Sequence, residues 1–195
     1  MSSRTETVIS DSARRQDLTG TYAIDPDHST IGFSVRHAMI SNVRGKFTAF
    51  EGLPKLDGER RARSEAHVSV QTGSLDTGIA QRDAHVTGAD FLDSATFPLM
   101  TFRSTGIAED GEGRFRMSGL LRIKDVELPL DIDLEFGGAG QDAGGPNRVG
   151  FEGTATLRRS DWGIDWNSAP ATGGVLVGDK VKLVLDISAV ELDPR

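Results

Sequence analysis

The side chains best suited to metal binding or acid–base chemistry are four histidines, His28, His37, His67 and His85. The chain has no cysteine, which excludes thiolate metal sites, disulfides and cysteine nucleophiles. Side chains alternate between the two faces of a strand, so His28 and His37 would lie on opposite faces of a continuous strand. No His-x-x-x-His or Glu-x-x-His spacing places two ligands on one helix face. The spacing therefore predicts no metal site.

Motifs for nucleophilic catalysis and phosphate binding are also missing. Residues 32–36, Gly-Phe-Ser-Val-Arg, lack the second glycine of a Gly-x-Ser-x-Gly elbow and are typical of a strand. No Gly-x-x-x-x-Gly-Lys-Ser/Thr loop occurs. We therefore expect no enzymatic activity. One alternative stays open, because His37 ends an apolar strand face, where its ring could act as an acid or base on an apolar substrate.

Composition narrows the classes of partner. The 195-residue chain has a formal net charge of −7, which argues against a nucleic-acid partner because phosphate contacts need a basic face. No stretch approaches the ~20 apolar residues of a membrane helix, and residues 1–11 lack the apolar run of a secretory signal. We expect no integral membrane segment and a cytoplasmic protein. Residues 1–19 are predicted to be a disordered tail before one domain, residues 20–195.

The elements that must position these side chains are mostly strands, because apolar and polar residues alternate along them. Residues 79–92 are predicted to form a short helical segment, residues 38–43 a short connector, and the glycine-rich residues 137–145 a flexible hairpin loop. The predicted strands cover residues 28–37, 44–52, 66–71, 99–104, 114–124, 126–136, 147–159 and 179–192.

Eight strands with one apolar face each predict an all-β fold, an eight-stranded antiparallel lipocalin-like barrel. Closure of the barrel removes the unpaired edges that would otherwise aggregate. Such a barrel either holds one small ligand or fills its interior with side chains. Both arrangements produce the same alternation, so a ligand-free structural or stress protein with a filled core stays an alternative.

Four segments in order along the chain resemble the YceI-like family, lipocalin-like proteins that bind polyisoprenoid lipids. They are residues 22–37, the run Gly45-Lys46-Phe47, residues 74–102 with Arg82-Asp83-Ala84-His85, and Arg159-Ser160-Asp161-Trp162-Gly163 with residues 177–181. Two departures stand out. Residues 121–126 replace a common Thr-Ile-x-Gly-Val pattern, and Trp162 stands where phenylalanine is common.

The resemblance implies an elongated barrel with an apolar channel for a long isoprenoid or other fatty lipid. The ligand would be a molecule such as a quinone or a prenyl phosphate, bound for transport, storage or sequestration, with no other cofactor. Members of the family often form dimers, so a homodimer is expected as well.

The predicted lipid-contacting residues are the inward-facing members of these strands, with His37 near the mouth. They are Ile31, Phe33, Val35, Phe47, Phe102, Met117, Leu121, Leu134 and Phe151. Arg82 is the candidate for an anionic head group if the mouth lies beside it. The neighbouring residues Arg82 and Asp83, and also Arg159 and Asp161, could form charge pairs near a barrel end.

Overall fold

The computed structural model describes residues 18–141, 145–168 and 176–192. The strands in this part of the chain are β1 (Gly20–Ile24), β2 (Thr30–His37), β3 (Ser41–Phe47), β4 (Phe50–Gly52), β5 (Lys55–Leu56), β6 (His67–Gln71), β7 (Leu75–Asp76), β8 (Leu99–Glu109), β9 (Arg114–Ile123), β10 (Val126–Gln141), β11 (Asn147–Arg158) and β12 (Val177–Glu191). The helical elements are α2 (Ala80–Thr87) and the 3-10 turns η1 (Pro26–His28), η2 (Arg61–Arg63), η3 (Thr72–Ser74) and η4 (Arg159–Trp162).

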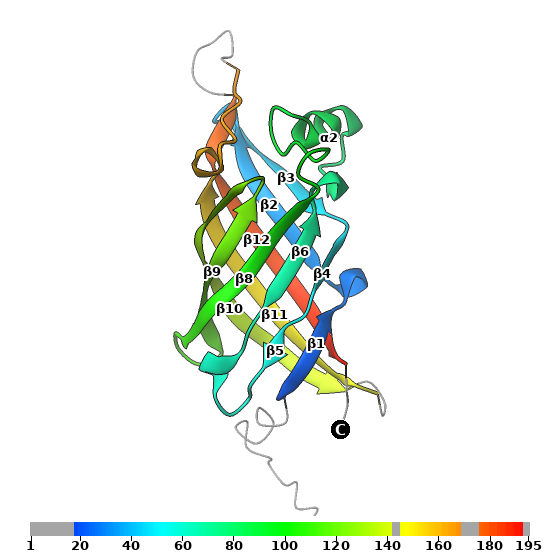
Figure 1. The fold of residues 1–195 in the computed structure, drawn as a ribbon, viewed down its shortest axis with the longest axis vertical. Coiled ribbons are helices and arrows are strands. Elements are labelled where there is room, and N and C mark those ends of the chain that lie inside the picture. Colours follow the sequence, from blue (N-terminus) through cyan, green and yellow to red (C-terminus); the bar gives the residue numbers. More distant parts are fainter. Residues whose placement is uncertain (1–17, 142–144, 169–175, 193–195) are drawn as a thin grey trace, which may run out of the picture.

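The strands form one curled antiparallel sheet in the order β4-β6-β8-β9-β10-β11-β12-β2-β3-β7, with β1 and β5 attached beside β12. Figure 1 shows α2 at one end of this barrel and β1 and β5 toward the other. We call these the α2 end and the β5 end. The lipocalin-like all-β fold is confirmed, but the described residues form twelve strands rather than eight. Most of the difference comes from β4, β5 and β7, which are only two or three residues long.

The predicted strand 44–52 is in fact two strands that lie at opposite edges of the sheet. β3 pairs with β2 and β7, whereas β4 pairs with β6. Thr48 and Ala49 lie between them and donate backbone hydrogen bonds to the Ser74 carbonyl and hydroxyl oxygens. The chain therefore passes from one sheet edge to the other at this point and links the two edges of the barrel.

The predicted connector 38–43 is shorter than expected, because β3 already begins at Ser41. Ala38 and Met39 form the tight turn with φ angles of 48° and 57°. This left-handed conformation costs residues other than glycine ~1–2 kcal/mol each. The Ile40 amide donates to the His37 carbonyl at 3.0 Å, so Ala38 and Met39 are the two central residues of this turn.

The predicted loop 137–145 is strand as far as Gln141, and residues 142–144 lie outside the described part. Pairing with β11 overrides the flexibility of the glycines, since Gln141 lies opposite Asn147. A bulge between Phe136 and Gly138 is allowed by the φ of 133° at Gly138. The helical segment predicted over residues 79–92 is the helix α2, which ends at Thr87 before Gly88.

A small second core joins β1 to the barrel. Tyr22, Val149 and Ala189 are almost fully buried together. The Tyr22 hydroxyl donates to the Leu18 carbonyl at 3.0 Å, and burial together with the nearby Glu191 raises the pKa of Tyr22 to about 12. Of the predicted tail, residues 1–17 lie outside the described part, but Leu18 packs on this core.

Asp25 fixes the turn between β1 and β2. Its carboxylate accepts hydrogen bonds from Arg148 at 2.7 Å, from the His28 ring at 2.8 Å and from the Asp27 amide at 3.1 Å. The Arg148 bond is the main reason that the pKa of Asp25 falls from 3.8 to about 2. The carboxylate therefore stabilises the fold only while it is ionised.

We expect Asp25→Asn to lower the free energy of unfolding at neutral pH. Because the pKa of Asp25 is depressed in the folded state, its contribution is complete above pH 3.8 and is lost as the pH falls through about 2. Urea titrations of both proteins across this range should show the difference shrinking toward acid pH. A difference that stays constant down to about pH 2 would mean that the charge of Asp25 is not the stabilising factor.

Candidate functional site

The interior of the barrel holds a cavity of about 740 Å³. Its lining extends from His37 and Arg82 at the α2 end to Leu56 and Arg61 at the β5 end. The volume lies within the roughly 300–1,000 Å³ typical of small-molecule sites. The lining between the two ends is almost entirely aliphatic and aromatic.

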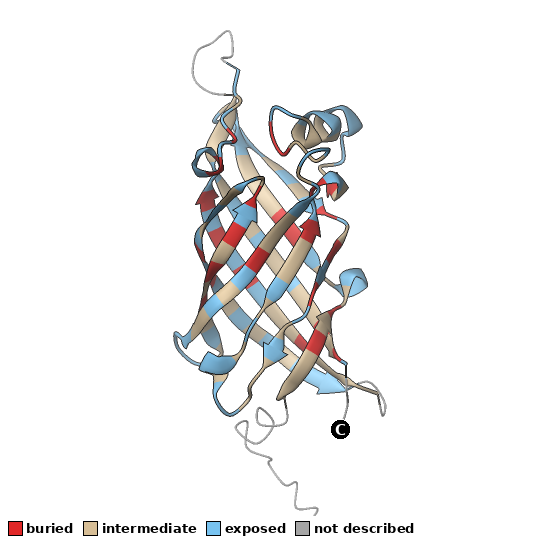
Figure 2. Ribbon diagram, viewed as in Figure 1, coloured by how far each residue is buried: buried red, intermediate tan, exposed pale blue. Residues whose placement is uncertain are grey.

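Partial exposure of inward-facing side chains shows that the interior is hollow. On β12, Leu183, Leu185 and Ile187 all line the cavity yet keep intermediate accessibility, as do Leu134 and Phe151. A filled barrel would bury them completely. Figure 2 places the fully buried residues mainly in the half of the barrel nearer to α2. The filled-core alternative therefore does not describe this structure.

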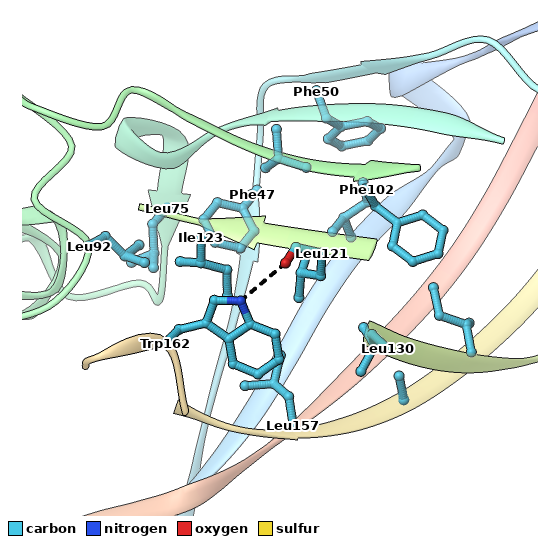
Figure 3. Close-up of a cluster of buried hydrophobic side chains, with 14 of the residues drawn as sticks. Phe47, Phe50, Leu75, Leu92, Phe102, Leu121, Ile123, Leu130, Leu157 and Trp162 are labelled. Carbon is cyan, nitrogen blue, oxygen red and sulfur yellow. Dashed lines mark hydrogen bonds between the residues drawn. The ribbon is translucent and has the colours of Figure 1, made fainter. Parts of the chain in front are cut away.

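Trp162, which is 3% exposed, lies in a buried hydrophobic cluster, several members of which line the cavity. Its indole Nε1 donates to the Leu121 carbonyl at 3.1 Å, as Figure 3 shows. Phe47, Phe102 and Leu157, which the same view labels, belong to the same cluster of buried residues as this ring. The hydrogen bond satisfies the one polar atom of the indole, so tryptophan is well accommodated at this position.

Two inward-facing glycines leave room for aromatic rings from neighbouring strands. A Cβ on Gly45 would lie 2.5 Å from the Phe33 ring, and a Cβ on Gly119 would lie 2.2 Å from the Phe102 ring. Each ring thus lies across the backbone of the adjacent strand. The Phe33 and Phe47 rings are also in contact, with centroids 5.9 Å apart.

All of the residues predicted to contact lipid, and also Arg82, line this cavity. Ile31, Phe47, Phe102, Met117 and Leu121 are buried in its walls. Phe33, Val35, Leu134 and Phe151 have part of their surface open to it, and His37 is an exposed residue at the α2-end rim. Their position is thus established, whereas their contact with a lipid stays a prediction.

The polar part of the lining differs between the two ends. At the α2 end it contains Arg36, His37, Gln81, Arg82, His85 and Arg159, and no carboxylate. At the β5 end it contains Asp57 and Glu65 together with Arg61. Among the described residues, the α2 end of the cavity is therefore the one that favours an anion.

Arg82 is held in place by a neutral partner rather than by Asp83. Its Nε donates to the Thr77 hydroxyl at 2.7 Å and its Nη2 to the Thr77 carbonyl at 2.9 Å. The same hydroxyl donates to the Asp83 carboxylate. Asp83 therefore orients Thr77, and Thr77 orients the guanidinium at the cavity rim.

Arg159 is only 7% exposed and binds no carboxylate among the described residues. Its Nε donates to the Gly178 carbonyl at 3.0 Å, its Nη1 to the Ile164 and Trp166 carbonyls at 2.6 and 2.9 Å, and its Nη2 to the Val177 carbonyl at 3.1 Å. Burial lowers the pKa of Arg159 from its usual value, yet a guanidinium stays charged in proteins. The expected charge pair with Asp161 is thus wrong, since backbone carbonyls take its place.

Aromatic contacts join α2 to the segment that follows η4. The His85 ring meets the Trp166 ring edge-on at 4.6 Å and the Phe91 ring at 5.2 Å. His85 Nε2 also lies 2.9 Å from an Asp90 carboxylate oxygen. These contacts hold α2 against the other side of the α2-end mouth.

The sequence matches the family described as YceI-like domain over residues 22–189. The chain belongs to the YceI-like family. A UPF0312 protein of Vibrio cholerae is 39% identical over 145 residues, 73% of this chain and 77% of that protein. A UPF0312 protein of Azotobacter vinelandii is 33% identical over 177 residues, 90% of this chain and 89% of that protein.

Solved structures share the YceI-like fold. Burkholderia cenocepacia BcnA superposes with a TM-score of 0.75 at 22% identity over 85% of this chain and 98% of that chain. A Campylobacter jejuni YCEI protein mutant with a monobromobimane guest gives 0.70 at 26% identity, over 81% and 90%. A polyisoprenoid binding domain from Saccharophagus degradans gives 0.63 at 15% identity, over 87% and 98%.

The histidines of this YceI-like chain form no contact with one another that the described residues show. In the part of the chain that the structure describes, no group of three histidine or acidic residues could hold a metal ion. His37 lies at the rim, and no described side chain forms a hydrogen bond or ion pair with its ring. An acid–base role for His37 would therefore lack the partner that usually orients a catalytic imidazole.

Sequence reasoning missed several residues of the YceI-like cavity. Arg159 and Trp166 contribute to the lining, as do eight of the β5-end residues, which are Pro54, Leu56, Asp57, Gly58, Arg61, Ser64, Glu65 and Ala66. The alternation of residues 181–187 was a usable signal for β12, but no local pattern identifies Arg159, whose partners lie in two separate segments.

Among the described residues, no helix is long and apolar enough to cross a bilayer. The compartment and the homodimer stay predictions.

We expect Arg159→Lys to lower the free energy of unfolding by about 2–4 kcal/mol, because one ammonium group cannot reach all the carbonyls that the planar guanidinium binds. The neighbouring Arg158→Lys is the matched control, since Arg158 is exposed and lies 3.9 Å from Asp179. Chemical denaturation of both variants makes the comparison. Equal and small losses in the two proteins would contradict the structural role of Arg159.

Proposed function

We propose that this protein binds a long-chain isoprenoid lipid in the barrel cavity, with the lipid tail between the sheet walls and its head group at the α2 end. It would transport, store or sequester the lipid rather than convert it. The observation that carries the proposal is the cavity of about 740 Å³, lined by apolar side chains from one end of the barrel to the other.

The chemistry of the lining favours a hydrocarbon chain. Burial of apolar ligand surface contributes about 25 cal/mol per Å², or ~0.8 kcal/mol for each CH₂ group. Side chains such as Phe33, Leu134 and Leu183 offer no hydrogen bonds in the middle of the cavity, so a polar ligand would lose its hydration there without compensation. The cavity therefore favours a ligand with a long apolar chain.

The charges at the α2 end support the orientation of the ligand. Arg82 and Arg159 contribute positive charge to a lining that has no carboxylate at this end. A phosphate or pyrophosphate group would find charge-assisted hydrogen-bond donors there. At the β5 end it would meet Asp57 and Glu65. A prenyl phosphate is thus preferred over a neutral quinone.

The names of relatives agree with this ligand class. The Saccharophagus degradans domain, which has the same fold, is described as polyisoprenoid binding. The YceI-like family assignment covers the whole barrel, so the cavity-forming strands are all part of the shared domain.

We expect Leu183→Trp to reduce lipid uptake at least about tenfold by filling the cavity without introducing a charge. Phe33→Asp should also abolish uptake, since it places a carboxylate against the hydrocarbon chain. Uptake is measured by adding a prenyl lipid to the purified protein, followed by native mass spectrometry.

The matched control for Phe33→Asp is Ser34→Asp, because Ser34 is the next residue and lies on the outer face of β2. It should fold and bind lipid like the natural protein. If Leu183→Trp and Phe33→Asp both fold and still take up lipid normally, the cavity is not the binding site.

We expect Arg82→Gln to weaken binding of a prenyl phosphate by roughly five- to tenfold, because it removes a charged donor to the phosphate. Binding of the uncharged prenol of the same chain length should not change, which makes it the internal control. Competition titrations with the two ligands make this comparison. An equal loss for both would show that Arg82 shapes the cavity rather than binding the head group.

A further inference from the structure

The turn between β2 and β3 projects large apolar side chains into solvent. Ile40 is 85% exposed and Met39 is 62% exposed, and they are the two most exposed large hydrophobic residues among those described. Ile79, at the start of α2, is also exposed. A solvated hairpin turn normally carries polar residues or glycine at such positions, so the composition of this turn points to a partner.

The turn lies directly beside the α2-end mouth of the cavity. The Ala38 amide donates to the Leu176 carbonyl at 2.8 Å, and both Leu176 and His37 line the cavity. Ala38 and Met39 adopt the left-handed conformation that asparagine and glycine prefer. The turn thus keeps an apolar tip at the expense of local backbone strain, which a glycine at position 39 would relieve.

Basic residues lie along the strands that lead to this tip and along the neighbouring strand β12. Residues 31–50 contain no aspartate or glutamate, although the whole chain has a net charge of −7. The exposed basic residues on the outward side of β2, β3 and β12 are Arg44, Lys46, Lys180 and Lys182, and Arg36 is exposed at the rim of the cavity. None of them forms an ion pair within the described part of the chain.

We propose that the β2–β3 hairpin docks the protein on an anionic lipid bilayer, with Met39 and Ile40 inserted among the acyl chains and the cations on the phosphate groups. Exposed apolar residues next to basic ones are the features that bind an interfacial surface. This geometry places the α2-end mouth of the cavity against the membrane, where a lipid could enter without crossing water. Docking itself requires no ligand in the cavity.

The test is flotation of the purified full-length protein with two kinds of vesicle, pure phosphatidylcholine and an equal mixture of phosphatidylcholine and phosphatidylglycerol. The natural protein should float with the mixed vesicles, much less with the neutral ones, and less at high salt. The double variant Met39→Gly/Ile40→Ser should lose about tenfold or more in affinity. It should not be less stable, because glycine relieves the strain at position 39.

Ala38→Asn is the control for the turn, since it relaxes the backbone but leaves the apolar tip intact. Its vesicle binding should equal that of the natural protein. For the charges, Arg44→Gln/Lys180→Gln should weaken binding to mixed vesicles by ~fivefold per charge, and neither residue lines the cavity. Arg60→Gln/Arg63→Gln removes the same charge at the β5 end, where both residues are exposed, and should have no effect.

Several outcomes would overturn the docking proposal. The natural protein could fail to float, or the β5-end variant could lose as much binding as the hairpin variant. A third outcome is that neither the natural protein nor Met39→Gly/Ile40→Ser binds vesicles, while size measurements show a dimer for the first and a monomer for the second. The tip would then be a contact between subunits. Uptake of a prenyl lipid from detergent solution is measured in parallel, so that loss of docking and loss of the carrier function are distinguished.

Discussion

The curled antiparallel sheet encloses more space than its own inward side chains fill, and the candidate site follows from this constraint. Only every second residue of a strand points inward. Along β12 these residues are Val181, Leu183, Leu185 and Ile187, which have medium size and keep part of their surface open to the interior. Backbone pairing around the barrel holds the walls apart, and the cavity lies between them.

The contacts that build the α2 end also determine the charge of its mouth. At the α2 end, Arg159 joins the start of β12 to the segment after η4 through backbone carbonyls rather than carboxylates. No carboxylate among the described residues therefore forms an ion pair with this positive charge. Arg82 is oriented by Thr77 in a similar way. The same contacts that close the fold thus leave this mouth positive and suited to an anion.

The inward residues could be predicted from the sequence because strand alternation is a local property. Phe33, Leu134 and Phe151 each lie in a run of period two, and the structure places all of them on the cavity wall. The ordered motifs identified the YceI-like family, and with it the lipocalin-like barrel. Glycine content misled the prediction for residues 137–141, because pairing with β11 decides their conformation.

The sequence by itself determined the all-β class, the inward faces of the strands and the family, since each depends on residues close together in the chain. Only the tertiary structure decided that the interior is hollow, that the segment 44–52 divides between two sheet edges, and that Arg159 binds four carbonyls. It also decided which charges meet at the α2 end. These features depend on strand register and on contacts between distant segments, which no local pattern encodes.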